Sequence, residues 1–446
     1  MSEQWTLRIH LVLEVSVPKE ATMFQALTLA FWRFQGLAAT TLFKEVLKSI
    51  QERVRQDLDL RHPGRFRHKG FQPRTWEMPF GRVTMPLLKL RDREARRVVM
   101  PLKEAMDMPE RFTWCEDKLL PGYRLAVLQS FRESNKAVEK TCPDGRAPHH
   151  STLHRRFQRF AGRLDLVPDP GGGGEPDPMA YQQADGTKLA MQDQGRNAGK
   201  TDLRLVVGSR TPQGRLEVLD FSVGDTWDAI AERLRARFPE PPKVLVSDGE
   251  EEIPTALAGP NTRHQRCLVH ARRGLPFALY RDEIKKADRE PWTEAFQEIP
   301  AMQMCQAEVN RLAQGDKTAL QALLESSEKA FAALLAKLPR SACPYTHQYV
   351  MGLIRDGLTY LRLLLEGGPG ILVSTNRTES LMSRLALRLK RIGKRWSPPG
   401  ALNMLAAVLT TAMHPESYEQ LEALIRGEDK PTVSILITSL ESAWVT

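Results

Sequence analysis

The sequence predicts a mixed α/β protein whose sheet-forming core is interrupted by an all-helical segment and preceded by an α+β region. Three observations support this class. Strand-like and helix-like patterns alternate over residues 179–271, and residues 272–366 have the pattern of amphipathic helices. The stretch VPDPGGGGEPDP, residues 167–178, cannot hold a helix or a strand, so it is a linker that separates these parts from the preceding region.

The first region, residues 1–120, begins with a predicted strand. In TLRIHLVLEVSV, residues 6–17, apolar and polar side chains alternate, which is typical of a half-buried strand and not of a signal peptide. A helix is expected over residues 21–60, short strands over 64–90, and further helices from Pro101. Contact with DNA and dimerisation are both open as roles for this region.

Residues 121–166 predict three helices that form a helix-turn-helix-like unit. The third, STLHRRFQRFAGRL, carries Arg155, Arg156 and Arg159 beside the apolar Leu153 and Phe157. A short, arginine-rich last helix suits a unit that places this helix against DNA. A basic helix that simply faces solvent is the alternative.

The composition limits the class of partner and the compartment. With 446 residues the chain is too long for one core, and its net charge of +10 is compatible with a polyanionic partner, most simply nucleic acid, or with none. Five scattered cysteines are typical of a reducing compartment. No run approaches the roughly 18 apolar residues of a membrane span. We therefore expect a soluble, cytoplasmic protein without a membrane partner.

The segment 179–271 predicts a five-stranded sheet. A helix, TWDAIAERLRARF, precedes the fourth strand, and a short helix from Glu251 precedes the fifth. The five strands are AYQQADGTKLAMQ, TDLRLVVGS, RLEVLDFSVG, KVLVSDG and HQRCLV. This order of strands and helices is the one found in RNase H-like folds, in which the first and fourth strands are neighbours.

Two aspartates occupy these neighbouring strands and are candidate metal ligands. Asp185 lies in the first strand and Asp248 ends the fourth. With a third acid, they would suit two Mg²⁺ ions about 4 Å apart for phosphodiester chemistry. Glu379, in STNRTESLM, is the candidate third acid, and a capping box with Asn376 is its alternative role. The three glutamates that follow Gly249 are expected to be solvent-facing acids of a helix N-terminus.

Three blocks of the sequence resemble, in order, signature blocks of Mutator-like DDE transposases of bacterial insertion sequences: ADGTKL, LVSDGEEEIPTAL followed by HQRCLVHARR, and STNRTESLMSRL. The N-terminal half resembles the branch of that group with a long β-containing N-terminal region, through TLFKEVLKSI, PFGRVTMPLLKLRD and PLKEAMDMP. The resemblance implies that Asp185, Asp248 and Glu379 form a catalytic, metal-binding triad. It also implies that residues 272–366 are an all-helical insertion and that 367–446 complete an RNase H-like core.

The resemblance further implies the cofactor and the partners. Two Mg²⁺ ions, for which Mn²⁺ can substitute, would serve cleavage and strand transfer. The DNA partners would be the terminal inverted repeats of the element and its target. The protein would act in the bacterial cytoplasm, associated with the nucleoid, and as at least a dimer, since two DNA ends must be held together.

Further candidate DNA contacts lie beside the triad. Cys267 and His270 form the C-x-x-H of the family, followed by Arg272 and Arg273. A zinc site would need a second ligand pair that the sequence lacks, and a packed cysteine with a surface histidine is the alternative. The family often has Asn after this arginine, where the present chain has Gly274.

The helix after Glu379 carries a second group of candidate DNA contacts. At helical spacing Arg384, Arg388 and Arg391 share one face, apart from an apolar stripe that includes Leu385. This arginine face predicts phosphate contacts, or else an ordinary solvated surface.

Three functions remain open from the sequence. The first is a DDE transposase of an insertion sequence, which binds terminal inverted repeats and catalyses Mg²⁺-dependent strand cleavage and strand transfer. The second is an RNase H-like nuclease or resolvase without strand transfer. The third is a domesticated, non-catalytic DNA-binding protein, which the presence of all three acids disfavours.

Overall fold

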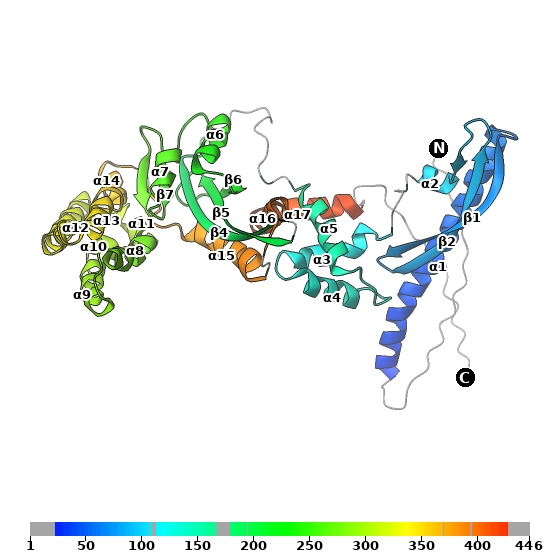
Figure 1. The fold of residues 1–446 in the computed structure, drawn as a ribbon, viewed down its shortest axis with the longest axis horizontal. Helices are drawn as coiled ribbons and strands as arrows, with labels where there is room; N and C mark the ends of the chain where they lie inside the picture. The colour runs from blue at the N-terminus through cyan, green and yellow to red at the C-terminus, as the bar shows by residue number, and fades with distance from the viewer. Residues whose placement is uncertain are drawn as a thin grey trace. The chain divides into compact units, whose positions relative to one another are not determined.

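The computed structural model of the chain describes residues 23–106, 108, 113–164, 166, 179–193, 195–368, 370–392 and 395–426. The chain divides into two compact units: residues up to Phe160 together with those from Glu416, and Ala161–Pro415 (Figure 1). The architecture is mixed α/β with two sheets, as the sequence predicts. The strand expected at residues 6–17 and the linker at 167–178 lie outside the described residues.

In the first unit a long helix packs on a small antiparallel sheet. The elements are α1 (Met23–Arg61), β1 (Phe66–Met78), β2 (Gly81–Asp92), β3 (Val98–Val99) and α2 (Pro101–Ala105). Leu47 of α1 is buried with Trp76 of β1 and Met85 of β2. The helix, the pair of strands and the helical start at Pro101 therefore agree with the prediction.

The same unit continues with the three helices of the expected helix-turn-helix-like unit: α3 (Glu116–Ala126), α4 (Phe131–Thr141) and α5 (His150–Ala161). The last described helix, α17 (Pro415–Arg426), packs against them. The rings of Tyr418 and Phe160 are 5.0 Å apart, and Arg124 donates a 2.7 Å hydrogen bond to Glu422. The sequence analysis grouped α17 with the C-terminal core helices, which is wrong, because these contacts tie it to the first unit.

The second unit contains a five-stranded sheet in the order β6-β5-β4-β7-β8. Its strands are β4 (Tyr181–Asp193), β5 (Arg196–Ser209), β6 (Glu217–Val223), β7 (Val244–Ser247) and β8 (Arg263–Arg266). β4, β5 and β6 pair antiparallel, whereas β7 runs parallel to both β4 and β8. The first and fourth strands are therefore neighbours.

Both faces of this sheet are covered. In β7, Val244 and Val246 belong to one core and Leu245 to another, as alternation along a strand buried on both sides requires. Helices α6 (Trp227–Arg237) and α7 (Glu252–Leu257) supply the core around Leu245. Two helices that come later in the chain, α15 (Asn376–Ala386) and α16 (Pro398–Met413), contact β4 and β6 respectively.

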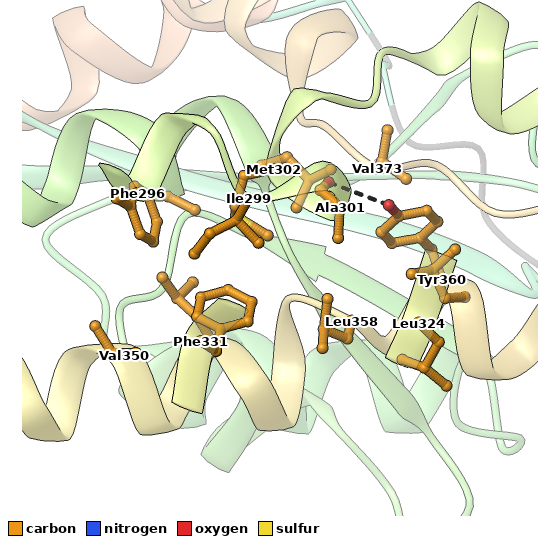
Figure 2. Packing of buried hydrophobic residues seen from close by; sticks show 14 of the residues in the cluster. Phe296, Ile299, Ala301, Met302, Leu324, Phe331, Val350, Leu358, Tyr360 and Val373 are labelled. Carbon is orange, nitrogen blue, oxygen red and sulfur yellow. Dashed lines mark hydrogen bonds between the residues drawn. The ribbon is translucent and has the colours of Figure 1, made fainter. Parts of the chain in front are cut away.

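Helices fill the segment between β8 and α15. They are α8 (Leu268–Arg281), α9 (Lys286–Gln297), α10 (Pro300–Gln303), α11 (Gln306–Leu312), α12 (Lys317–Lys337), α13 (Pro344–Asp356) and α14 (Thr359–Leu365). Their core is continuous with Val244 of the sheet (Figure 2). In this core the hydroxyl of Tyr360 donates a 3.1 Å hydrogen bond to the carbonyl of Ala301, so this buried polar group has a partner.

Two predicted elements differ from the observed ones. HQRCLV was expected to be one strand, but β8 ends at Arg266 and α8 begins at Leu268. The single helix expected after Glu379 becomes a π-helix over Leu387–Ile392. In the described ranges no helix is both long enough and apolar enough to cross a bilayer.

Candidate functional site

Asp185 is positioned by the alternation of side chains along β4. Tyr181, Gln183 and Asp185 share one face of the strand because side chains two residues apart point the same way. Thr378 of α15 donates a 2.7 Å hydrogen bond to the amide oxygen of Gln183, so this face is the one that α15 covers. Asp185 is only 9% exposed.

Asp248 is brought beside Asp185 by the register of two parallel strands. Tyr181 pairs with Val244 and Gln183 with Val246, an offset of 244 − 181 = 63 residues. Asp185 and Asp248 are separated by the same 248 − 185 = 63 residues, so the register extended by two residues places them opposite each other. The Asp248 carboxylate accepts a 2.9 Å hydrogen bond from the Glu250 backbone, which fixes the turn that leaves β7.

Glu379 comes from the first turns of α15, on the same face of the sheet. Thr375 precedes this helix and donates a 3.2 Å hydrogen bond to the Glu379 carboxylate. The alternative capping-box role does not hold, because α15 already includes Asn376 and the Glu379 carboxylate is held by a side chain and not by a backbone amide. Glu379 also lies 3.6 Å from Nδ1 of His270.

Cys267 and His270 lie where three segments converge. The Cys267 amide donates to Ser247 of β7 over 2.8 Å, and the Leu268 amide donates to Val373 over 2.9 Å. The Thr375 amide donates to the Cys267 sulfur over 3.3 Å. The end of β7, the start of α8 and the start of α15 are therefore held together, which brings the C-x-x-H pair next to Glu379.

The surroundings of Asp185 raise the pKa of its carboxyl group. Burial, and then the negative charge of Asp248, raise its pKa to about 6. Glu379 adds a smaller repulsion, while His270 acts in the opposite direction. Three carboxylates that repel one another in a half-buried site need a nearby positive charge to ionise together.

His270 supplies part of that positive charge. Its hydrogen bond with Cys267 outweighs its burial and raises its pKa to about 9, so the ring is protonated at neutral pH. Burial of Cys267 opposes ionisation of the thiol, but hydrogen bonds from His270 and Thr375 outweigh it and its pKa is lowered. The pair therefore consists of a protonated imidazole and a thiol that ionises more readily than usual.

The ligand atoms available at this site suit some metal ions better than others. One ligand atom each of Cys267, His270 and Glu379 lies within 4.8 Å of the others. A protonated imidazole offers no lone pair, and ligation needs the neutral ring. The carboxylate oxygens of Asp185, Asp248 and Glu379 are the hard donors that Mg²⁺ and Mn²⁺ prefer. Among the described residues, however, the ligand atoms that come within 4.8 Å of one another are those of Cys267, His270 and Glu379 and not those of the three acids.

Two arginines that were expected to contact DNA contact other parts of the protein. Arg156 forms a 2.7 Å ion pair with Glu116, and Arg272 donates to the carbonyls of Met302 and Met304, the latter over 2.9 Å. Both arginines are engaged within the protein, and their role as DNA contacts stays a prediction.

Arg388 was also expected to be an exposed DNA contact, and this expectation fails because of its burial. It is 2% exposed, with its guanidinium 5.1 Å from the centre of the Trp396 ring. Arg388 belongs to a π-helical stretch, Leu387–Ile392, and faces inward there, whereas Arg384 near the end of α15 is exposed. Arg384 and Arg391 remain exposed, as do Arg155, Arg159 and Arg273.

Sequence reasoning missed two residues of the site. Thr375 contacts both Glu379 and Cys267, and its only signal was its place just before the acid-bearing helix. Lys390 donates a hydrogen bond to Thr187, two residues beyond Asp185. Gly249 turns the chain after Asp248 with a φ of +108°, a backbone angle that favours glycine. A Cβ there would also lie 2.5 Å from Cζ of Arg266, so both the backbone angle and the lack of space favour glycine.

No protein-family profile matches the chain, and no curated protein matches it in sequence. Among solved structures the chain is similar to the Drosophila P element transposase strand transfer complex, with 13% identity and a TM-score of 0.37. That alignment covers 69% of this chain and 94% of the other. A TM-score of this size does not establish a common fold.

Proposed function

We propose that the chain is a DDE transposase of an insertion sequence. Its core would be RNase H-like, built from residues 179–271 and 367–415 and interrupted by the helices of 272–366. One observation carries the proposal: Asp248 directly follows β7, whose register with β4, extended by two residues, puts it opposite Asp185, and Glu379 belongs to α15, which covers the same face. The resemblance of the three sequence blocks to Mutator-like transposases supports the same triad.

The three carboxylates would hold two Mg²⁺ ions, with Mn²⁺ able to substitute. When bound, these ions would activate the attacking water or 3′-hydroxyl and stabilise the leaving oxygen of the phosphodiester. Thr375 orients the Glu379 carboxylate through its hydroxyl. The protonated ring of His270 is a suitable partner for the scissile phosphate, because it is a cation hydrogen-bonded in place beside the acids.

Exposed arginines would hold the DNA backbone. Arg155 and Arg159 lie on the surface of α5, Arg273 on α8, and Arg384 and Arg391 beyond Glu379. The net charge of +10 favours such a partner. We propose that the DNA carries the terminal inverted repeats of the element and its target, that at least two copies of the chain act together, and that they act in the bacterial cytoplasm.

A strand-transfer assay tests this function. The purified chain is mixed with pre-cut duplexes that carry the repeats expected at the ends of its encoding element, together with a supercoiled target. In Mg²⁺ the proposal predicts joined products, which EDTA and Asp185→Asn both abolish. Cleavage of uncut ends without any joining would indicate a nuclease, and joining by Asp185→Asn would contradict the proposed triad. Light scattering of the DNA complex checks the expected dimer.

A further inference from the structure

A cavity of about 550 Å³ lies next to the proposed catalytic residues within the second unit. Gly249, which follows Asp248, lines it, and so does Arg266, which precedes Cys267. Further lining residues come from α8 and α13, and Glu250, Glu251, Pro254 and His264 complete the lining. Ligand pockets range over roughly 300–1,000 Å³, so this one is large enough for a single nucleotide and too small for a duplex.

Three aromatic rings line the cavity. Phe277 of α8 is 71% exposed and Tyr345 of α13 is 44% exposed, which is unusual for large apolar side chains. Tyr349 is half-buried, and its hydroxyl donates a 2.7 Å hydrogen bond to the carbonyl of Ala271. One ring is therefore held rigidly, and the other two present open apolar surface.

Two arginines stack on these rings. The guanidinium of Arg266 lies 4.4 Å from the centre of the Tyr349 ring, and that of Arg281 lies 4.0 Å from the centre of the Tyr345 ring. Within the part of the chain that the structure describes, neither has a carboxylate at ion-pair distance, and Nε of Arg266 is buried without a hydrogen-bond partner. The cavity thus combines flat stacking surfaces with two guanidiniums that form no ion pair among the described residues. Three acids also line it: Glu250, Glu251 and Asp356.

We propose that this cavity binds one unpaired nucleotide of the DNA substrate, beside the bond that is cut. The inference rests on the proposed function and adds a subsite to it. Aromatic rings and guanidinium planes stack on a base only when the base has left the duplex. Arg266 and Arg281 would contact the phosphate of this nucleotide; Glu250, Glu251 and Asp356 also line the cavity, so the phosphate must approach the two guanidiniums and not these acids.

Fluorescence of 2-aminopurine tests the proposal on the full-length chain. The probe is a short single-stranded oligonucleotide with 2-aminopurine near its 3′ end, in EDTA so that nothing is cleaved. Removal of one stacking ring is expected to weaken single-strand binding about 5- to 150-fold in Phe277→Ala or Tyr345→Ala. The affinity for a blunt duplex should not change. Tyr280→Ala is the matched control, since Tyr280 is 65% exposed on the same helix but does not line the cavity.

Each possible result either supports or overturns the nucleotide subsite. The proposal predicts quenched 2-aminopurine with the wild type and with Tyr280→Ala, and a loss of quenching and affinity in the two cavity variants. Equal single-strand affinity in all four proteins, or no single-strand binding by the wild type, would overturn it. Because the assay needs no cleavage, failure here leaves the triad untouched. Failure of the triad is recognised separately, by Mg²⁺-dependent joining that survives Asp185→Asn.

Discussion

Gly274 of α8 is the position where a single methyl group should perturb the region beside the site most clearly. A Cβ at this position would collide with Oη of Tyr349 and lie 2.8 Å from its Cζ, closer than real Cβ contacts. The Tyr349 ring cannot yield cheaply, because its hydroxyl is bonded to Ala271 and Arg266 stacks on its face. The asparagine that the resembling family often has here would not fit against Tyr349.

The cost of Gly274→Ala can be worked out from these contacts. Overpacking costs about 1–3 kcal/mol, and loss of the Tyr349 hydrogen bond about 1 kcal/mol. The gain from replacing a helical glycine by alanine is about 1 kcal/mol. We therefore expect the free energy of unfolding to fall by roughly 1–3 kcal/mol, measured by urea denaturation followed by circular dichroism.

Gly352 in α13 provides the matched control. A Cβ there meets only Nη1 of Arg266, at 3.8 Å, an ordinary contact. Gly352→Ala should therefore raise the free energy of unfolding, by up to about 1 kcal/mol. If Gly274→Ala were as stable as Gly352→Ala, the close packing of Tyr349 against α8 would be refuted.

Three further predictions concern other groups. Lys118→Met should lower the free energy of unfolding by at most about 3–5 kcal/mol in urea, because it removes the ammonium partner of buried Glu77, which keeps Arg82, and of partly buried Asp144, whereas Lys136→Met in an exposed pair should cost at most about 1 kcal/mol. Mn²⁺ affinity, measured by electron paramagnetic resonance, should weaken as pH falls through about 6, because Asp185 then gains a proton; an affinity that stays constant across this window would contradict the assigned pKa. Arg391→Ala should reduce the salt dependence of DNA binding by about one unit of log–log slope, whereas Arg388→Met should change the unfolding free energy and leave that slope unchanged.

The sequence predicts most of the second unit because hydrophobic patterning and turn residues separate its strands from its helices. The 63-residue spacing of Asp185 and Asp248 also proves to be the strand register itself. HQRCLV was misassigned only beyond Arg266, because Leu268 and Val269 begin α8 and two apolar residues after a strand fit a buried helix as well as a longer strand.

The inward-facing environments of three arginines were missed for a similar reason, because they depend on structure that the local sequence does not reveal. A uniform repeat of 3.6 residues put Arg388 on an exposed face, and the π-helical stretch Leu387–Ile392 departs from that repeat. Arg156 and Arg272 are basic residues on helices, and only tertiary structure brings Glu116 and the carbonyl of Met304 to them. The docking of α17 on the first unit likewise depends on contacts between residues nearly 300 positions apart, such as Arg124 with Glu422.

The most direct test of the proposed triad is Mg²⁺-dependent cleavage of a supercoiled plasmid that carries the encoding gene and its flanking DNA. Asp248→Asn should reduce cleavage to the level seen in EDTA while leaving the affinity for the same DNA unchanged. Glu252→Gln, which changes an exposed acid in the first turn of α7, should cleave like the wild type. Cleavage that persists in Asp248→Asn would contradict the assignment of Asp185, Asp248 and Glu379 as the catalytic residues.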